Sequence, residues 1–130
     1  MGTQRAALGR RGEGRAVRYL ESLGYEIVER NYRCRHGEID VIARDGGDLA
    51  FVEVKTRRTD EDGCPSAAVD LRKRRRIVLS AWNYLQEKDL GEIDCRFDVA
   101  EVYFVDGRRV RVDLIKGAFS ADEAACGEEI

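Results

Sequence analysis

The sequence contains no long apolar run, which excludes a membrane-spanning helix, because such a helix needs about 20 consecutive apolar residues. No apolar stretch follows the arginine-rich residues 1–18, so the pattern of a secretory signal is missing. The four cysteines include no Cys-x-x-Cys pair, which argues against a disulfide framework. We therefore expect a cytoplasmic protein with reduced thiols and no membrane partner.

Proline and histidine are almost absent, with one residue of each. Pro65 lies in a polar stretch that is typical of a loop. The sole histidine, His36, lies in an expected turn, and we interpret it as a turn residue rather than a general base. Histidine chemistry is therefore not the expected basis of function.

Basic and acidic residues are unevenly distributed, although the formal net charge is only −2. Residues 1–88 carry 18 basic and 14 acidic residues, whereas residues 89–130 carry 5 and 11. A nucleic-acid surface is therefore expected within the first two thirds of the chain. We expect one domain over residues 1–116 and an acidic, flexible tail over residues 117–130.

Hydrophobic periodicity and turn residues divide the chain into seven elements. Gly24 and Gly91 mark the ends of two helices, and residues 45–48 (DGGD) are typical of a tight hairpin. The expected elements are a helix over about 10–23, strands over 25–33, 38–44 and 49–56, a loop over 57–65, a helix over 67–88, and strands over 96–105 and 109–115. This order, α-β-β-β-α-β-β, predicts an α/β fold with a mixed sheet flanked by helices. Trp82, on the second helix, is interpreted as a partly buried anchor.

The hairpin at residues 45–48 predicts which side chains share one face of the sheet. If Gly46 and Gly47 form the loop, Asp40 faces Glu53 and Glu38 faces Lys55. The period of two places these four side chains on one face. The opposite face is entirely apolar and is expected to be core; it carries Ile39, Val41, Ala43, Ala50, Val52 and Val54.

Two opposed carboxylates on one hairpin suggest a cation site. Directly opposed side chains have Cβ atoms roughly 4.5–5.5 Å apart, so Asp40 and Glu53 repel each other unless a cation lies between them. Carboxylate oxygens suit Mg²⁺ or Mn²⁺, and Lys55 points to the same side, where it can hold a water. The alternative from geometry alone is a solvated face with cross-strand ion pairs.

Two sequence segments carry a resemblance that favours the cation site. Residues 37–43 (GEIDVIA) and 51–57 (FVEVKTR) resemble the paired-strand motif of PD-(D/E)xK nucleases. Over about residues 9–116 the chain resembles the YraN-type family of bacterial endonuclease-like proteins, relatives of archaeal Holliday-junction resolvases. The resemblance includes residues 9–13 (GRRGE), 31–33 (NYR) and 96–99 (RFDV). It implies a restriction-endonuclease-like core. Ile39 stands where the motif has its proline, which is dispensable in this fold.

The resemblance also implies roles for individual residues. Asp40 and Glu53 correspond to ligands of Mg²⁺ or Mn²⁺, and the backbone carbonyl of Val54 completes the set. Lys55 corresponds to the residue that positions the nucleophile. Glu13 corresponds to a first-helix acid that supports the metal; its alternative role is to complement the helix dipole.

The function that follows from these expectations is metal-dependent hydrolysis of a DNA phosphodiester, on branched or damaged DNA. The basic residues expected to contact phosphates are Arg10, Arg11, Lys73 and Arg76. Symmetric cleavage of a junction would require a homodimer. Two alternatives remain open at this point: a catalytically silent nucleic-acid-binding or partner-binding module that retains a relic nuclease site, and an enzyme that acts on RNA.

Overall fold

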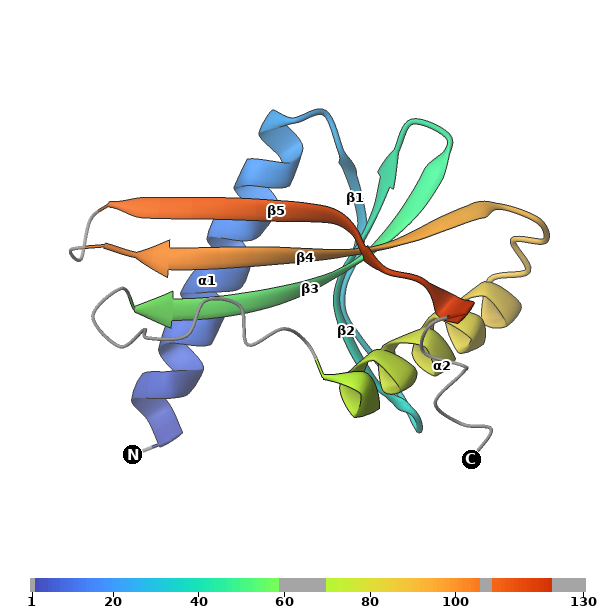
Figure 1. Cartoon of the computed structure of the whole chain (residues 1–130), viewed down its shortest axis with the longest axis horizontal. Coiled ribbons are helices and arrows are strands. Elements are labelled where there is room, and N and C mark those ends of the chain that lie inside the picture. The colour runs from blue at the N-terminus through green and yellow to red at the C-terminus, as the bar shows by residue number, and fades with distance from the viewer. Residues whose placement is uncertain (1, 59–69, 106–108, 123–130) are drawn as a thin grey trace.

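The protein has three layers, in which a five-stranded sheet lies between two helices (Figure 1). The computed structural model describes residues 2–58, 70–105 and 109–122. Its elements are α1 (Gly2–Ser22), β1 (Glu26–Cys34), β2 (Gly37–Asp45), β3 (Asp48–Arg58), α2 (Leu71–Glu87), β4 (Asp94–Phe104) and β5 (Val110–Phe119). The predicted α/β class and the predicted order of helices and strands are confirmed. Most of the loop predicted over residues 57–65 lies outside the described residues, as does the chain from residue 123 onward.

The sheet is mixed because one pair of neighbours runs in parallel. Its strand order is β1-β2-β3-β4-β5, with β3 and β4 parallel and the other pairs antiparallel. Parallel strands need a long crossover connection, and this connection includes α2. The sheet therefore joins a meander of β1, β2 and β3 to a hairpin of β4 and β5.

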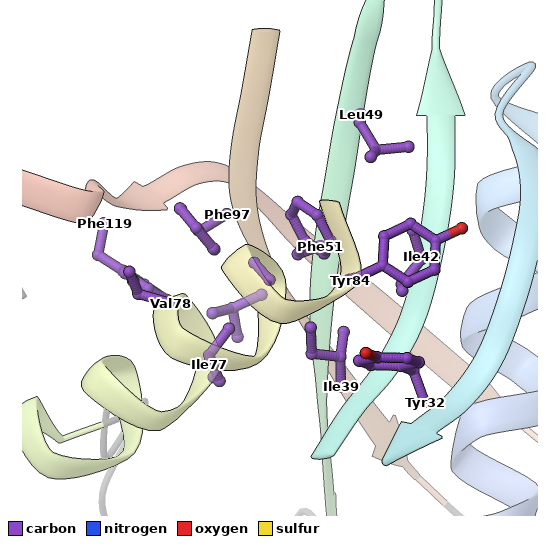
Figure 2. Packing of buried hydrophobic residues seen from close by; sticks show 12 residues of the cluster. Tyr32, Ile39, Ile42, Leu49, Phe51, Ile77, Val78, Tyr84, Phe97 and Phe119 are labelled. Carbon is purple, nitrogen blue, oxygen red and sulfur yellow. The ribbon is translucent and has the colours of Figure 1, made fainter. Parts of the chain in front are cut away.

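The core on the α2 side of the sheet is rich in aromatic residues (Figure 2). Ile77, Val78 and Tyr84 of α2 point toward the sheet in this view. The Phe97 ring stacks between those of Phe51 and Phe119, with centroid distances of 5.7 and 5.1 Å. Such contacts add to the hydrophobic stabilisation of the burial itself. Tyr84 attaches α2 to this stack by an edge-on contact with Phe51, at a centroid distance of 6.1 Å.

The core on the α1 side consists mostly of small and β-branched residues. Ala16, Val17 and Leu20 of α1 pack against residues of β2, β3 and β4. Gly12 allows a particularly close approach, because a Cβ at this position would collide with Oγ1 of Thr56 in β3. The small side chains therefore place α1 directly over the strand that carries Glu53.

A polar network of five residues connects the hairpin of β2 and β3 to β4. Asp98, which is fully buried, accepts hydrogen bonds of 2.9 and 3.0 Å from the Arg96 guanidinium. The same guanidinium donates to Asp45 and Asp48, at 3.0 and 3.2 Å, and to Tyr25 Oη at 2.7 Å. The hydrogen bonds to Asp98 raise the pKa of Arg96 further above its usual value. Arg96 and Asp98 are therefore structural, and they hold the turn end of the hairpin in place.

Two boundaries and one side-chain environment differ most from the sequence predictions. Helix α1 begins at Gly2 rather than near Arg10, and Leu8 extends its apolar stripe. Strand β5 continues to Phe119, because Gly117 (φ 61°) forms an irregularity at which its N–H donates to Asp98. Trp82 was predicted to be a partly buried anchor, but 58% of its surface is exposed, so this prediction is wrong.

In the part of the chain that the structure describes, no helix combines the length and the apolar composition needed to span a lipid bilayer.

Candidate metal centre

Strands β2 and β3 separate at the position of the predicted carboxylate pair. Their ladder runs from Asp45 opposite Asp48 to Val41 opposite Val52, which confirms the register expected for a Gly46-Gly47 loop. Beyond this last pair, β3 continues beside β4 while β2 turns away with β1 (Figure 1). We call this divergence the fork. Asp40 and Glu53 are the first residues beyond the ladder, so their side chains lie at the base of the fork.

Asp40 is held against β3 by a backbone hydrogen bond. The N–H of Val54 donates to Oδ2 of Asp40 at 2.8 Å. The N–H and C=O groups of one strand residue point toward the same neighbouring strand, so the Val54 carbonyl is also expected to face the fork. This arrangement places one carboxylate and one backbone carbonyl on the same side of β3.

The environment of Asp40 disfavours its negative charge. Burial and the charge of Glu53 raise the pKa of Asp40 to about 8, while the Val54 hydrogen bond opposes the shift. The charges of Glu13 and Glu38 add smaller contributions in the same upward direction. Without a cation, these surroundings therefore favour the protonated form of Asp40.

Glu53 is buried, with 5% of its surface exposed, and it forms an ion pair with Lys73 of α2. The Lys73 Nζ atom lies 2.6 Å from Oε2 of Glu53. Burial lowers the pKa of Lys73, but the hydrogen bond and charge of Glu53 outweigh it, and the pKa is raised overall. Lys73 was predicted to contact phosphates, and the structure places it inside the candidate site.

Lys55 lies beside the same ion pair. Burial and the charge of Lys73 lower the pKa of Lys55 below its usual value, although the Glu53 carboxylate opposes the shift. Lys55 shares the face of β3 that carries Glu53, because strand residues two apart point to the same side. The site therefore contains two carboxylates and two amines from three different elements.

Glu13 approaches the site from α1. The charge of Glu13 raises the pKa of Asp40. The neighbouring residue, Gly12, packs closely on Thr56 of β3, and this contact brings Glu13 near the site. Glu13 is half-buried, and it lies in the middle of α1 rather than in its first turn. Its placement therefore does not support the alternative role of complementing the helix dipole.

The remaining basic residues that were predicted to contact DNA lie on both helices. Arg10 and Arg11 are exposed on α1, and the Arg11 guanidinium lies over the Phe104 ring at 4.9 Å from its centroid. Arg76 is exposed on α2, where its side chain passes Gly37 at the start of β2. Since α1 and α2 cover opposite faces of the sheet, these arginines do not form one continuous row.

The donor groups at the fork suit a hard divalent cation. Asp40, Glu53 and the Val54 carbonyl all offer oxygen, and Mg²⁺ typically uses only one or two carboxylates together with waters and substrate phosphates. Over residues 2–58, 70–105 and 109–122, no group of three or more His, Cys, Asp or Glu side chains is arranged to hold a metal ion. The two carboxylates and the carbonyl fit Mg²⁺ or Mn²⁺ as a partial ligand set.

The sequence model of the uncharacterised protein family UPF0102 matches residues 12–102. The chain belongs to the UPF0102 family. A UPF0102 protein of Syntrophus aciditrophicus is 50% identical over 117 residues, which cover 90% of this chain and 91% of that protein. A UPF0102 protein of Geobacter sulfurreducens is 46% identical over 112 residues, which cover 86% and 88%. UPF0102 is the YraN family, so the resemblance to YraN-type proteins is confirmed.

The matched segment of the UPF0102 family includes every candidate site residue except Arg10 and Arg11. The contact of Lys73 with Glu53 was not predicted from the sequence. Five successive basic residues at 72–76 cover all sides of a helix, and nothing in that run distinguishes the one that points into the site. Asp70, which caps α2, was an available signal for where the helix begins and therefore for which basic residues lie in its first turn.

Proposed function

We propose that this UPF0102 protein is a Mg²⁺- or Mn²⁺-dependent endonuclease that hydrolyses DNA phosphodiesters, with a preference for branched or damaged DNA. The observation that carries the proposal is the position of Asp40, Glu53 and Lys55 at the fork. Two carboxylates placed together in a poorly solvated site repel each other, and a divalent cation relieves that repulsion. The hydrolase assignment rests on this chemistry and on the resemblance to PD-(D/E)xK nucleases.

Each residue of the site has a role in the proposed reaction. Asp40, Glu53 and the Val54 carbonyl would hold the cation, and Glu13 would support Asp40 from α1. When bound, the cation would polarise a phosphoryl oxygen and lower the pKa of a water. Lys55, with its lowered pKa, would orient the attacking water by a hydrogen bond and counter the negative charge that develops on the phosphate.

The phosphate contacts outside the site are assigned to Arg10, Arg11 and Arg76. Arginine contacts to the phosphate backbone supply affinity without reading sequence. We therefore propose recognition of DNA structure rather than of base sequence.

We also propose a cytoplasmic location, for which the free thiols of Cys34 and Cys95 are the supporting observation. Homodimer formation, which symmetric cleavage of a junction would require, belongs to the same proposal.

A second candidate function is a binding module that retains a relic nuclease site. The observation that favours it is the ion pair of Lys73 with Glu53, which neutralises one of the two acidic side chains. A protein of this kind has no need of a cation. Metal binding therefore discriminates between the two candidates.

The proposed function is tested with a panel of linear, nicked, flapped and four-way DNA, in Mg²⁺, in Mn²⁺ and in a chelator. Single-stranded and hairpin RNA are included to test the RNA alternative. We expect cation-dependent cleavage, fastest on branched DNA, that is lost in Asp40→Ala and Glu53→Gln. Absence of cleavage of every nucleic acid, or equal cleavage by the wild type and both variants, would refute the proposal.

A further inference from the structure

The two partners of the ion pair between Lys73 and Glu53 differ in how freely their side chains can move. The Glu53 side chain is 5% exposed, whereas the Lys73 side chain is 45% exposed. Glu53 is fixed in the central strand β3, whose neighbours hold it on both sides up to the fork. Lys73 lies in the first turn of α2 and can turn its ammonium into solvent. If the pair opens, the lysine moves and the glutamate stays.

The ammonium of Lys73 occupies an oxygen that a cation would need. It lies 2.6 Å from Oε2 of Glu53, within the distance of a charge-assisted hydrogen bond. Its charge also acts on Asp40. A divalent cation bound between Asp40 and Glu53 would meet this positive charge at close range, and two like charges in a poorly solvated site repel strongly.

Lys73, rather than its neighbour Arg72, makes the contact with Glu53. Asp70 caps the helix, and its Oδ1 atom accepts a 2.9 Å hydrogen bond from the Lys73 N–H. The neighbouring Arg72 is exposed. Lys73 therefore differs from Arg72 in its contact with Glu53, although both carry one positive charge in the same helical turn.

We propose that Lys73 is an exchangeable counter-ion of Glu53, which a divalent cation must displace before the site can act. The inference deepens the proposed function and rests on it for the identity of the cation. Lys73 compensates the buried charge of Glu53 when no cation is bound. After displacement its ammonium remains at the mouth of the fork, where a substrate phosphate is the matching anion. Lys73 is a positioning residue in this scheme, and its first effect is on cation affinity.

The proposal is tested by calorimetric titration of the full-length protein with Mn²⁺ at constant pH and low salt. The variants are Lys73→Met and, as a matched control, Arg72→Met, which removes the same charge from the same turn. We expect Lys73→Met to lower the Kd for Mn²⁺ at least about tenfold, equivalent to about 1.4 kcal/mol. Arg72→Met should change it by less than about twofold, because solvent and salt screen an exposed charge.

A second measurement is independent of calorimetry. Lys73→Met leaves Glu53 without its counter-ion, so saturating Mn²⁺ should raise the Tm of this variant by more than it raises that of the wild type. If Lys73→Met does not fold, Lys73→Gln retains a hydrogen-bond donor toward Glu53 and replaces it in both measurements.

The possible outcomes separate this inference from the proposed function. Tighter Mn²⁺ binding by the Lys73 variant than by Arg72→Met supports the inference. This holds even if Mn²⁺ binding by the wild type is too weak to detect. Equal affinity in the two variants overturns it and leaves the metal site intact. Absence of Mn²⁺ binding in every protein overturns both the inference and the metal site. Tighter binding without any cleavage in the nucleic-acid panel supports the inference and refutes only the proposed function.

Discussion

The Val54 backbone N–H donates a 2.8 Å hydrogen bond to Oδ2 of Asp40, across the gap where β2 leaves β3. This bond fixes a carboxylate that has no ladder partner at its own position in the strand. It also ties that carboxylate to the peptide group next to Glu53. The two acidic side chains are therefore held near each other by the backbone, and neither relies on a flexible loop.

We expect Asp40→Ala to weaken Mn²⁺ binding by at least about tenfold, because it removes one of two carboxylate ligands. Calorimetric titration measures the effect. Glu38→Ala is the matched control, since Glu38 lies two residues earlier in β2 but is ion-paired with Arg33 at the surface. Equal binding by the wild type and Asp40→Ala would exclude Asp40 as a ligand.

We expect Lys55→Met to slow DNA cleavage by about 10²–10⁴-fold, the range typical of a lost acid–base or orienting group. Mn²⁺ affinity should not fall, since Lys55 supplies no ligand. Single-turnover cleavage and calorimetry on the same preparation separate the two effects. Arg44→Met, which removes an exposed charge from β2, controls for general electrostatics. A folded Lys55→Met protein that cleaves at the wild-type rate would remove Lys55 from the mechanism.

The stability of the metal-free protein should fall as pH rises from about 5 to 8. The folded protein keeps a proton on Asp40 up to a pKa of about 8, whereas an aspartate in the unfolded chain loses its proton near about 4. The folded state therefore binds more protons in this window, and the free energy of unfolding decreases with pH. Urea unfolding at several pH values measures the slope. Asp40→Asn should flatten it, and an unchanged slope would contradict the assignment.

DNA affinity should decrease steeply with salt and depend little on base sequence. Each phosphate contact contributes about −0.9 to the slope of log affinity against log salt. Arg10→Met and Arg76→Met should therefore each make the slope shallower by about one, as measured by gel shift on four-way and linear DNA. Arg30→Met, an exposed arginine on β1, is the control. A preference for one linear sequence, or affinity that is indifferent to salt, would contradict structure-selective recognition.

We expect Asp98→Ala to destabilise the fold by about 3–5 kcal/mol, because it leaves the Arg96 guanidinium without its buried partner. Asp113→Ala breaks the exposed pair with Arg111 and should cost less than about 1 kcal/mol. Urea unfolding of both variants gives the comparison. Similar losses in the two variants would mean that Arg96 is held mainly by Asp45 and Asp48.

The sequence was sufficient for the register of the hairpin because that pattern is local, but not for its faces: Ile39, predicted on the same face as Val41, lies in the core on the α2 side. The Gly46-Gly47 loop and the apolar alternation around it determine the register of β2 and β3, and with it the approach of Asp40 to Glu53. The order of the helices and strands along the chain followed equally from turn residues and periodicity. The seven elements were therefore predicted in the right order.

The features that the sequence did not reveal depend on packing between distant segments. Gly117 looked like the end of a strand, but its contact with Asp98 lets β5 continue to the buried Phe119. Trp82 is a large aromatic residue of the kind usually found in a core, yet it lies on the face of α2 that points away from the sheet. The selection of Lys73 from a run of five basic residues likewise depends on how α2 is oriented over β3.

The fork between β2 and β3 has a consequence for thermodynamic linkage. In a three-layer fold, the two helices are normally too far apart for their charges to interact, because the sheet and the side chains of both cores lie between them. At the fork, the charge of Glu13 on α1 and the charge of Lys73 on α2 both act on Asp40. The negative charge of Glu13 raises the pKa of Asp40, whereas the positive charge of Lys73 favours its ionised form, so the ionisation of this one carboxylate depends on residues from both faces of the sheet.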